Sequence, residues 1–145
     1  WRCSAGQRLH SMIGAIHFRI AGVILIALAL SHAWFPRKLG WTNDLRHMSL
    51  LNRQIFLVHS FFIALFVFLN GLLFLGWPGL LLQRSQLRNV VCVGIGLFWL
   101  CRFVVQLFIY DRSHWRGHRG KTIIHVCFTL FWAYLVVISF GVVVM

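Results

Sequence analysis

Four long apolar stretches constrain the fold of this chain more than any other feature of its sequence. A helix needs about 20 apolar residues to cross the hydrocarbon core of a bilayer. Stretches of that length lie at residues 12–35, 55–76, 89–110 and 122–144. The connecting segments are short, which places consecutive helices side by side. The sequence therefore predicts an all-α integral membrane protein, a four-helix up-down bundle that forms a single transmembrane domain over residues 1–145.

The composition agrees with a membrane protein and excludes several kinds of chemistry. Hydrophobic residues make up 60% of the chain and charged residues 11%, whereas soluble domains contain about 45–50% and about 25%. Asp44 and Asp111 are the only acids. Carboxylate-rich di-iron sites, aspartate-rich magnesium sites and chains of intramembrane acids need more carboxylates than these. The four cysteines form no C-x-x-C pair, so we interpret them as small hydrophobic residues.

The basic residues of the chain predict its orientation. Fourteen Lys and Arg give a formal net charge of +12. They fall between the apolar stretches, where such residues set topology and contact anionic lipids. This pattern does not favour a nucleic-acid partner. The loops at 36–54 and 111–121 each hold four Lys or Arg, and the other side holds fewer. We therefore expect both loops to be cytoplasmic and both termini to lie outside.

Two helix faces carry informative residues. Gly14 and Gly22 are eight residues apart, so they share a face of the first predicted helix, and small residues let helix backbones approach closely in a membrane. On the second predicted helix, His59 and Asn70 also share one face. The histidine is shallow in the membrane and the asparagine deep.

Four ionisable residues within the predicted spans lie at a similar depth. His32 lies near the end of the first span, and His59 and His125 lie near the starts of the second and fourth. Arg102 lies about two turns before the end of the third span, and Gln106 follows it on the same helix face. In an up-down bundle all of these fall in one leaflet. Intramembrane ionisable residues indicate function by default, although each of these could also snorkel, cap a helix or bond a neighbouring carbonyl.

A tetrapyrrole is the first ligand that this cluster could hold. A b-type haem needs one or two imidazoles that face the interior of a bundle. His32, His59 and His125 offer such ligands from three helices, and a chlorophyll-type pigment could use the same geometry. Arg102 could then pair with a propionate near the membrane surface, with Gln106 beside it.

A metal ion without a macrocycle is the second possibility. His114 and His118 are four residues apart, and His125 follows seven residues later. This spacing suits zinc, copper or iron if the segment is helical. Gly117 and Gly120 interrupt the segment, however, and histidine boxes of the membrane-hydroxylase kind are incomplete.

An anionic lipid or quinone headgroup is the third possibility. Arg53 and Arg116, together with Arg102, could bind an anion, and Trp41 and Trp115 could form amphipathic walls at the membrane surface. Aromatic residues at that level are expected in any membrane protein. The chain has no glycine-rich phosphate loop and no G-x-S-x-G motif, so we assign no catalytic residue.

Several segments together show a resemblance to known proteins. They are LNRQIF at 51–56 with His59, Phe98-Trp99, Arg102 through Gln106, and HWRG at 114–117. These segments are similar to an uncharacterised group of small four-span bacterial membrane proteins. The resemblance implies the four-helix architecture and a bacterial source, for which we expect the inner membrane. It implies no activity.

The sequence favours a non-catalytic accessory or assembly subunit of a larger energy-converting complex, respiratory or photosynthetic. Its 14 Phe and seven Trp provide large contact areas for lipid, pigment or partner helices. Two alternatives stay open. One is an electron-transfer protein that binds a b-haem or another tetrapyrrole through its histidines. The other is a membrane enzyme that acts on an anionic lipid or quinone headgroup.

Overall fold

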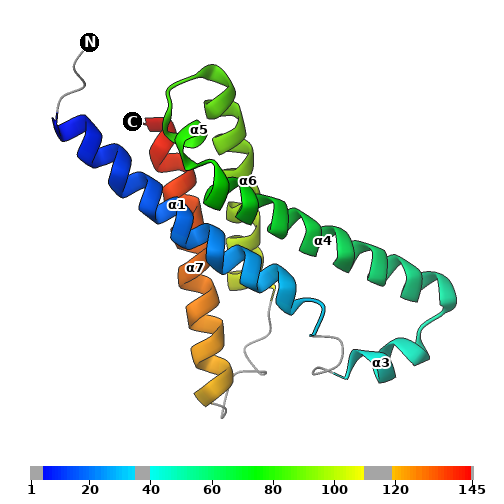
Figure 1. Ribbon diagram of the computed structural model, residues 1–145. Helices are drawn as coiled ribbons and strands as arrows, with labels where there is room; N and C mark the ends of the chain where they lie inside the picture. Colours follow the sequence, from blue (N-terminus) through cyan, green and yellow to red (C-terminus); the bar gives the residue numbers. More distant parts are fainter. Residues whose placement is uncertain (1–4, 35–39, 110–118, 145) are drawn as a thin grey trace. The chain divides into compact units, whose positions relative to one another are not determined.

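The computed structural model describes residues 5–34, 40–109 and 119–144, which form helices and turns without a strand. Four of these helices are long: α1 (Ala5–Ser31), α4 (Leu50–Gly76), α6 (Gln86–Phe108) and α7 (Arg119–Val144) (Figure 1). Each is long and apolar enough to cross a membrane. The prediction of an all-α membrane protein with four spanning helices is therefore confirmed, in keeping with a four-helix bundle.

The helix ends differ from the ends of the apolar stretches because of local capping. Helix α4 begins five residues before its predicted start, where the Ser49 hydroxyl accepts a hydrogen bond from the Asn52 backbone N–H at 3.4 Å. Helix α6 begins similarly, with Ser85 accepting from the Arg88 N–H at 3.0 Å. A side-chain acceptor before a helix satisfies one of its unpaired N–H groups. The first turns of α4 and α6 are therefore helical although their residues are too polar to belong to the apolar stretches.

Short helical elements lie between the long helices. Gly40, with a φ of 70°, precedes helix α3 (Trp41–Asp44), and the 3₁₀ turn η1 (Leu45–His47) follows it. Helix α5 (Pro78–Leu82) follows α4 after a single residue, Trp77. Proline is favoured at the first position of a helix because that position needs no backbone N–H.

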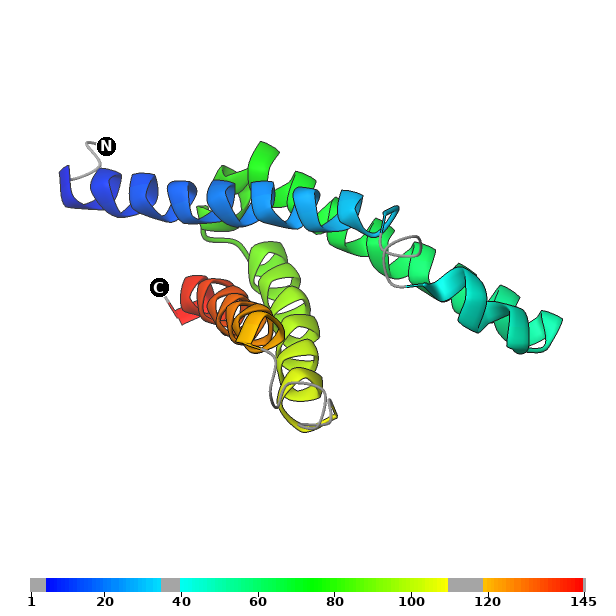
Figure 2. The same ribbon diagram turned by 90° about the horizontal axis from the view of Figure 1, so that it is seen from below.

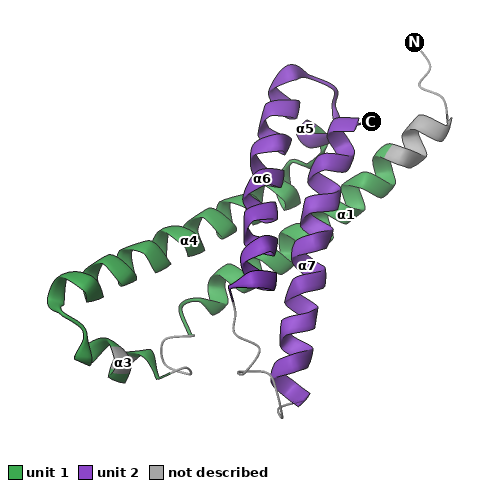
Figure 3. Ribbon diagram, turned by 180° about the vertical axis from the view of Figure 1, so that it is seen from behind, with its two compact units in different colours: residues 1–79 green, residues 80–145 purple. Residues whose placement is uncertain are grey.

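The chain divides into two compact units, residues 1–79 and 80–145 (Figure 3). In the first, α1 packs against α4, and in the second, α6 packs against α7. The grouping of both units into one transmembrane domain stays a prediction.

Helices α1 and α4 cross closely in an antiparallel arrangement (Figures 1 and 2). A Cβ atom on Gly22 would lie 2.7 Å from the backbone nitrogen of Leu75 and 2.8 Å from the carbonyl oxygen of Gly71. The Phe18 and Phe74 rings meet edge to face beside this crossing, with their centroids 5.0 Å apart. The close contact predicted for Gly22 is thus present, and it depends on glycine in both helices. The N-terminal part of α4 extends past the end of α1.

Helices α6 and α7 also run antiparallel, because contacts late in α6 are made early in α7. Gln106 meets His125, Trp99 meets Trp132, and Gly96 lies against the Phe140 ring. The centre of this pair is the stack of Trp99 on Trp132, whose rings are 5.0 Å apart and inclined by only 9°. Both indoles are almost fully buried, at 1% and 4% exposure.

Candidate functional site

Three polar side chains that the sequence placed at one depth lie on α6 and α7, and we call Arg102, Gln106 and His125 the α6–α7 polar cluster. Gln106 is 95% buried, with an exposed fraction of 5%. Its amide nitrogen lies 2.7 Å from Nδ1 of His125. The predicted polar face of α6 is thus directed at α7, and Gln106 and His125 bind each other across the helix pair.

Arg102 lies over an aromatic surface. Its guanidinium carbon is 5.4 Å from the centre of the Trp132 ring, within the range of a cation–π interaction. The Trp132 ring also stacks on Phe128, with centroids 5.7 Å apart, as well as on Trp99. Contact with a ring face offsets part of the cost of holding a cation inside a membrane helix.

The hydrogen bond of His125 determines which ring nitrogen carries its proton. An amide nitrogen donates and does not accept, so Nδ1 of His125 is the acceptor from Gln106. In the neutral ring the proton is then on Nε2. The hydrogen bond to Gln106 uses the Nδ1 lone pair and links α6 to α7. The use of His125 as a cofactor ligand stays a prediction.

The two other candidate histidines have the opposite tautomer. Nδ1 of His32 is 2.8 Å from the carbonyl oxygen of Leu28, and Nδ1 of His59 is 2.8 Å from that of Ile55. A carbonyl oxygen only accepts, so in both rings Nδ1 carries the proton. His32 is half-buried at the end of α1, and His59 is exposed on α4. Because they belong to the first unit and His125 to the second, convergence of all three on one cofactor stays a prediction.

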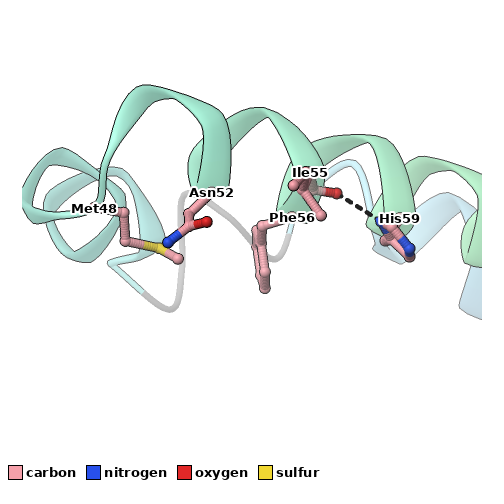
Figure 4. A pocket seen from close by; sticks show the side chains of 5 residues that line it. All are labelled: Met48, Asn52, Ile55, Phe56 and His59. Atoms are coloured by element: carbon pink, nitrogen blue, oxygen red, sulfur yellow. Dashed lines mark hydrogen bonds between the residues drawn. The ribbon is translucent and has the colours of Figure 1, made fainter.

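An open hollow of about 360 Å³ follows one face of α4 at its N-terminal end (Figure 4). We call it the α4 hollow. Phe56 lies in it and is braced by Trp41 of α3, whose ring meets the Phe56 ring edge to face at 5.2 Å. The residues that line the hollow are Met48, Asn52, Ile55, Phe56 and His59.

The remaining predicted residues contribute less to a site. His114, Trp115, Arg116 and His118 lie outside the described residues. Arg53 is exposed on α4, while Trp41 packs against Phe56. Within the described residues, no three His, Cys, Asp or Glu side chains lie close enough together to hold a metal ion.

Four buried polar atoms were not anticipated from the sequence. Within the described structure, hydrogen-bond partners are absent for Nε1 of Trp99 and Trp132, Oγ of Ser139 and Oδ1 of Asn70. The Asn70 amide nitrogen donates to the Phe66 carbonyl at 2.9 Å. Asn70 and His59 share a helix face, as predicted, but Asn70 is buried and His59 exposed. A shared face could be deduced from spacing, whereas the extent to which α1 covers that face could not.

No family model, curated protein or solved structure matches this chain.

Proposed function

We propose that this multi-span membrane protein is a non-catalytic accessory or assembly subunit of a larger energy-converting complex, respiratory or photosynthetic. The observation that carries the proposal is the uneven covering of α4. This helix has 27 residues, and its buried residues are Val67, Asn70, Gly71 and Phe74. All four lie in its second half, where α1 crosses it.

The first half of α4 presents large apolar side chains that α1 leaves uncovered. Phe61 and Phe62 are 62% and 60% exposed, and Leu57 and Ile63 are exposed as well. Aromatic rings provide large, rigid contact areas with specific packing geometry, and helices in membranes associate through such packing. An aromatic surface of this kind on a spanning helix supports a role in contact with other membrane subunits.

The polar residues of the second unit support a structural role for the same protein. Gln106 and His125 bind each other, and Arg102 lies on Trp132. Their side chains join α6 to α7, which is the use expected of polar groups that stabilise a helix pair in lipid. A stable helix pair with no described catalytic constellation suits a subunit that supports a complex.

Crosslinking in native membranes tests this proposal. A photoreactive amino acid replaces Phe62 in the tagged full-length protein, and a second variant carries it at Leu130 of α7, which is exposed to a similar degree, 65%. We expect the protein to copurify in mild detergent with other membrane subunits in fixed stoichiometry, and Phe62 to yield a discrete adduct with one of them. Leu130 reports how much adduct arises from random contact.

A protein that purifies alone would contradict the proposal. The same holds if position 62 gives no protein adduct above the level of position 130.

A further inference from the structure

The α4 hollow contains one histidine whose ring is held in a defined state. The hydrogen bond from His59 Nδ1 to the Ile55 carbonyl fixes the proton of the neutral ring on Nδ1. Nε2 therefore carries a lone pair. Figure 4 shows the ring on the same side of α4 as Phe56 and the Asn52 amide. Metal-binding histidines are commonly fixed in this way, with the other ring nitrogen donating to a backbone carbonyl.

The lone pair narrows the chemistry of the ligand. Neutral His59 has no donor at Nε2, so this nitrogen would not bind a quinone carbonyl or a phosphate oxygen; the donor that lines the hollow is the Asn52 side-chain amide. A bare zinc or copper ion needs three or four protein ligands, and the described residues contain no such group. A single imidazole is enough for a metal that brings its own equatorial ligands, which is the chemistry of a metal tetrapyrrole.

We propose that the α4 hollow binds a metal tetrapyrrole, a haem or a chlorophyll-type pigment, with Nε2 of His59 as the axial ligand. This site requires neither His32 nor His125. It also goes beyond the accessory role proposed above and does not depend on the presence of partner subunits.

The shape and lining of the hollow agree with a flat, largely apolar ligand. The hollow is an open surface depression of about 360 Å³ and not an enclosed cavity, so a ligand would lie against α4 with one face. Within α4 the lining extends from Asn52 to His59, seven residues or about 10 Å along the helix, and Met48 lies just before the helix. Between Asn52 and His59 lie Ile55 and Phe56, and Trp41 holds the Phe56 ring in place. A macrocycle ligated by His59 would contact these side chains with one face.

Charge at the end of the hollow suits the acidic groups of such a ligand. Arg46 and Arg53 are exposed near the start of α4, where the polar residues of this helix mark the membrane surface. His59 lies between two and three turns further along the helix, inside the apolar part. The metal would thus lie in the hydrocarbon layer, and tetrapyrrole carboxylates could reach the arginines.

Titration with hemin tests the site. The purified full-length protein in detergent is titrated with hemin, and in parallel with magnesium protoporphyrin, while the Soret band is followed. We expect saturable binding with one tetrapyrrole per chain. His59→Ala should weaken it by more than about tenfold, because loss of even an outer-shell partner of a metal ligand typically costs about 10- to 100-fold in affinity. Binding of hemin would indicate a haem site, and preference for the magnesium compound a pigment site.

Two histidines provide matched controls. His47 has the same arrangement, with Nδ1 3.0 Å from the Asn43 carbonyl, but does not line the hollow. His32 has it on α1. His47→Ala and His32→Ala should bind like the unaltered protein.

Ile55→Trp tests the hollow separately from the histidine. The larger side chain should fill the hollow and weaken binding while His59 stays in place. Because Ile55 is exposed, folding should be unaffected.

Three results would overturn the proposal. They are the absence of saturable binding of either compound, equal binding by the His59→Ala variant, and an equal loss in the His47→Ala variant.

Discussion

The side-chain amide nitrogen of Gln106 lies 2.7 Å from Nδ1 of His125 and links α6 to α7. These residues are 19 positions apart in the chain, and residues 110–118 lie between them. Hydrogen bonds between membrane helices contribute about 0.6 kcal/mol on average and up to about 2 kcal/mol. Because Gln106 is buried, removal of its partner also leaves an amide without a hydrogen bond in an apolar environment, which adds to the cost.

A double-mutant cycle should measure this link. We expect Gln106→Leu and His125→Leu each to lower the free energy of unfolding by about 1–2 kcal/mol. The double variant should lose about 0.6–1.7 kcal/mol less than the sum of the two single losses. Unfolding by sodium dodecyl sulfate in mixed micelles, followed by circular dichroism, gives these values. Strict additivity would show that the two side chains do not interact.

Replacement of Trp132 should disturb both the stack and the cation–π contact. Trp132→Leu removes the parallel partner of Trp99 and the ring face under Arg102. An aromatic pair contributes about 0.5–1.5 kcal/mol and a cation–π contact about 0.5–2 kcal/mol. We expect a loss of about 1–3 kcal/mol in unfolding free energy.

Near-ultraviolet circular dichroism provides a second readout of Trp132→Leu, because two stacked indoles couple their transitions. The variant should lose most of the tryptophan signal. Trp77→Leu is the control, since Trp77 is exposed and caps the end of α4 only through its backbone. An unchanged spectrum in Trp132→Leu would contradict the stacked geometry.

The helix caps should differ in strength in a predictable order. Ser85 accepts the Arg88 N–H at 3.0 Å, whereas Ser49 accepts the Asn52 N–H at 3.4 Å on an exposed surface. Loss of a serine cap costs about 0.5–2 kcal/mol. We expect Ser85→Ala to fall within that range and Ser49→Ala to cost less. Amide hydrogen exchange at Arg88 should accelerate more than exchange at Asn52, and the reverse order would refute this ranking.

The four spans could be predicted from the sequence because apolar length and the thickness of the bilayer determine them. Their ends could not be predicted as well. Hydropathy alone would start α4 after its polar residues Asn52 and Arg53. The Ser49 cap lets the helix start earlier, so that it includes both residues. The contact at Gly22 could be expected from its small size. Its partner Gly71 could not, because the choice of partner depends on how far each helix is rotated and shifted.

At the candidate site, too, the sequence indicated how deep each polar residue lies along its helix but not which neighbour its side chain binds. Spacing correctly placed Arg102 and Gln106 on one face of α6, and depth correctly matched His125 to them. Neither could show that Gln106 would donate to His125 and so fix its tautomer. The α4 hollow could not be predicted from the sequence either, because it depends on the packing of Trp41 in α3 against Phe56.

Substitution of Gly22 should separate α1 from α4. An added Cβ would meet two backbone atoms, Leu75 N at 2.7 Å and Gly71 O at 2.8 Å, and backbone cannot move aside as a side chain can. Overpacking of this kind costs about 1–3 kcal/mol. Gly94→Ala in α6 is the matched control, because nothing lies within 4 Å of its added Cβ and alanine favours a helix by up to about 1 kcal/mol. We therefore expect Gly22→Ala to destabilise the protein and Gly94→Ala to leave it unchanged or slightly more stable. Cysteine pairs across the α1–α4 crossing should also crosslink more slowly in Gly22→Ala. Equal stability of the two variants would show that the helices do not approach as closely as their glycines allow.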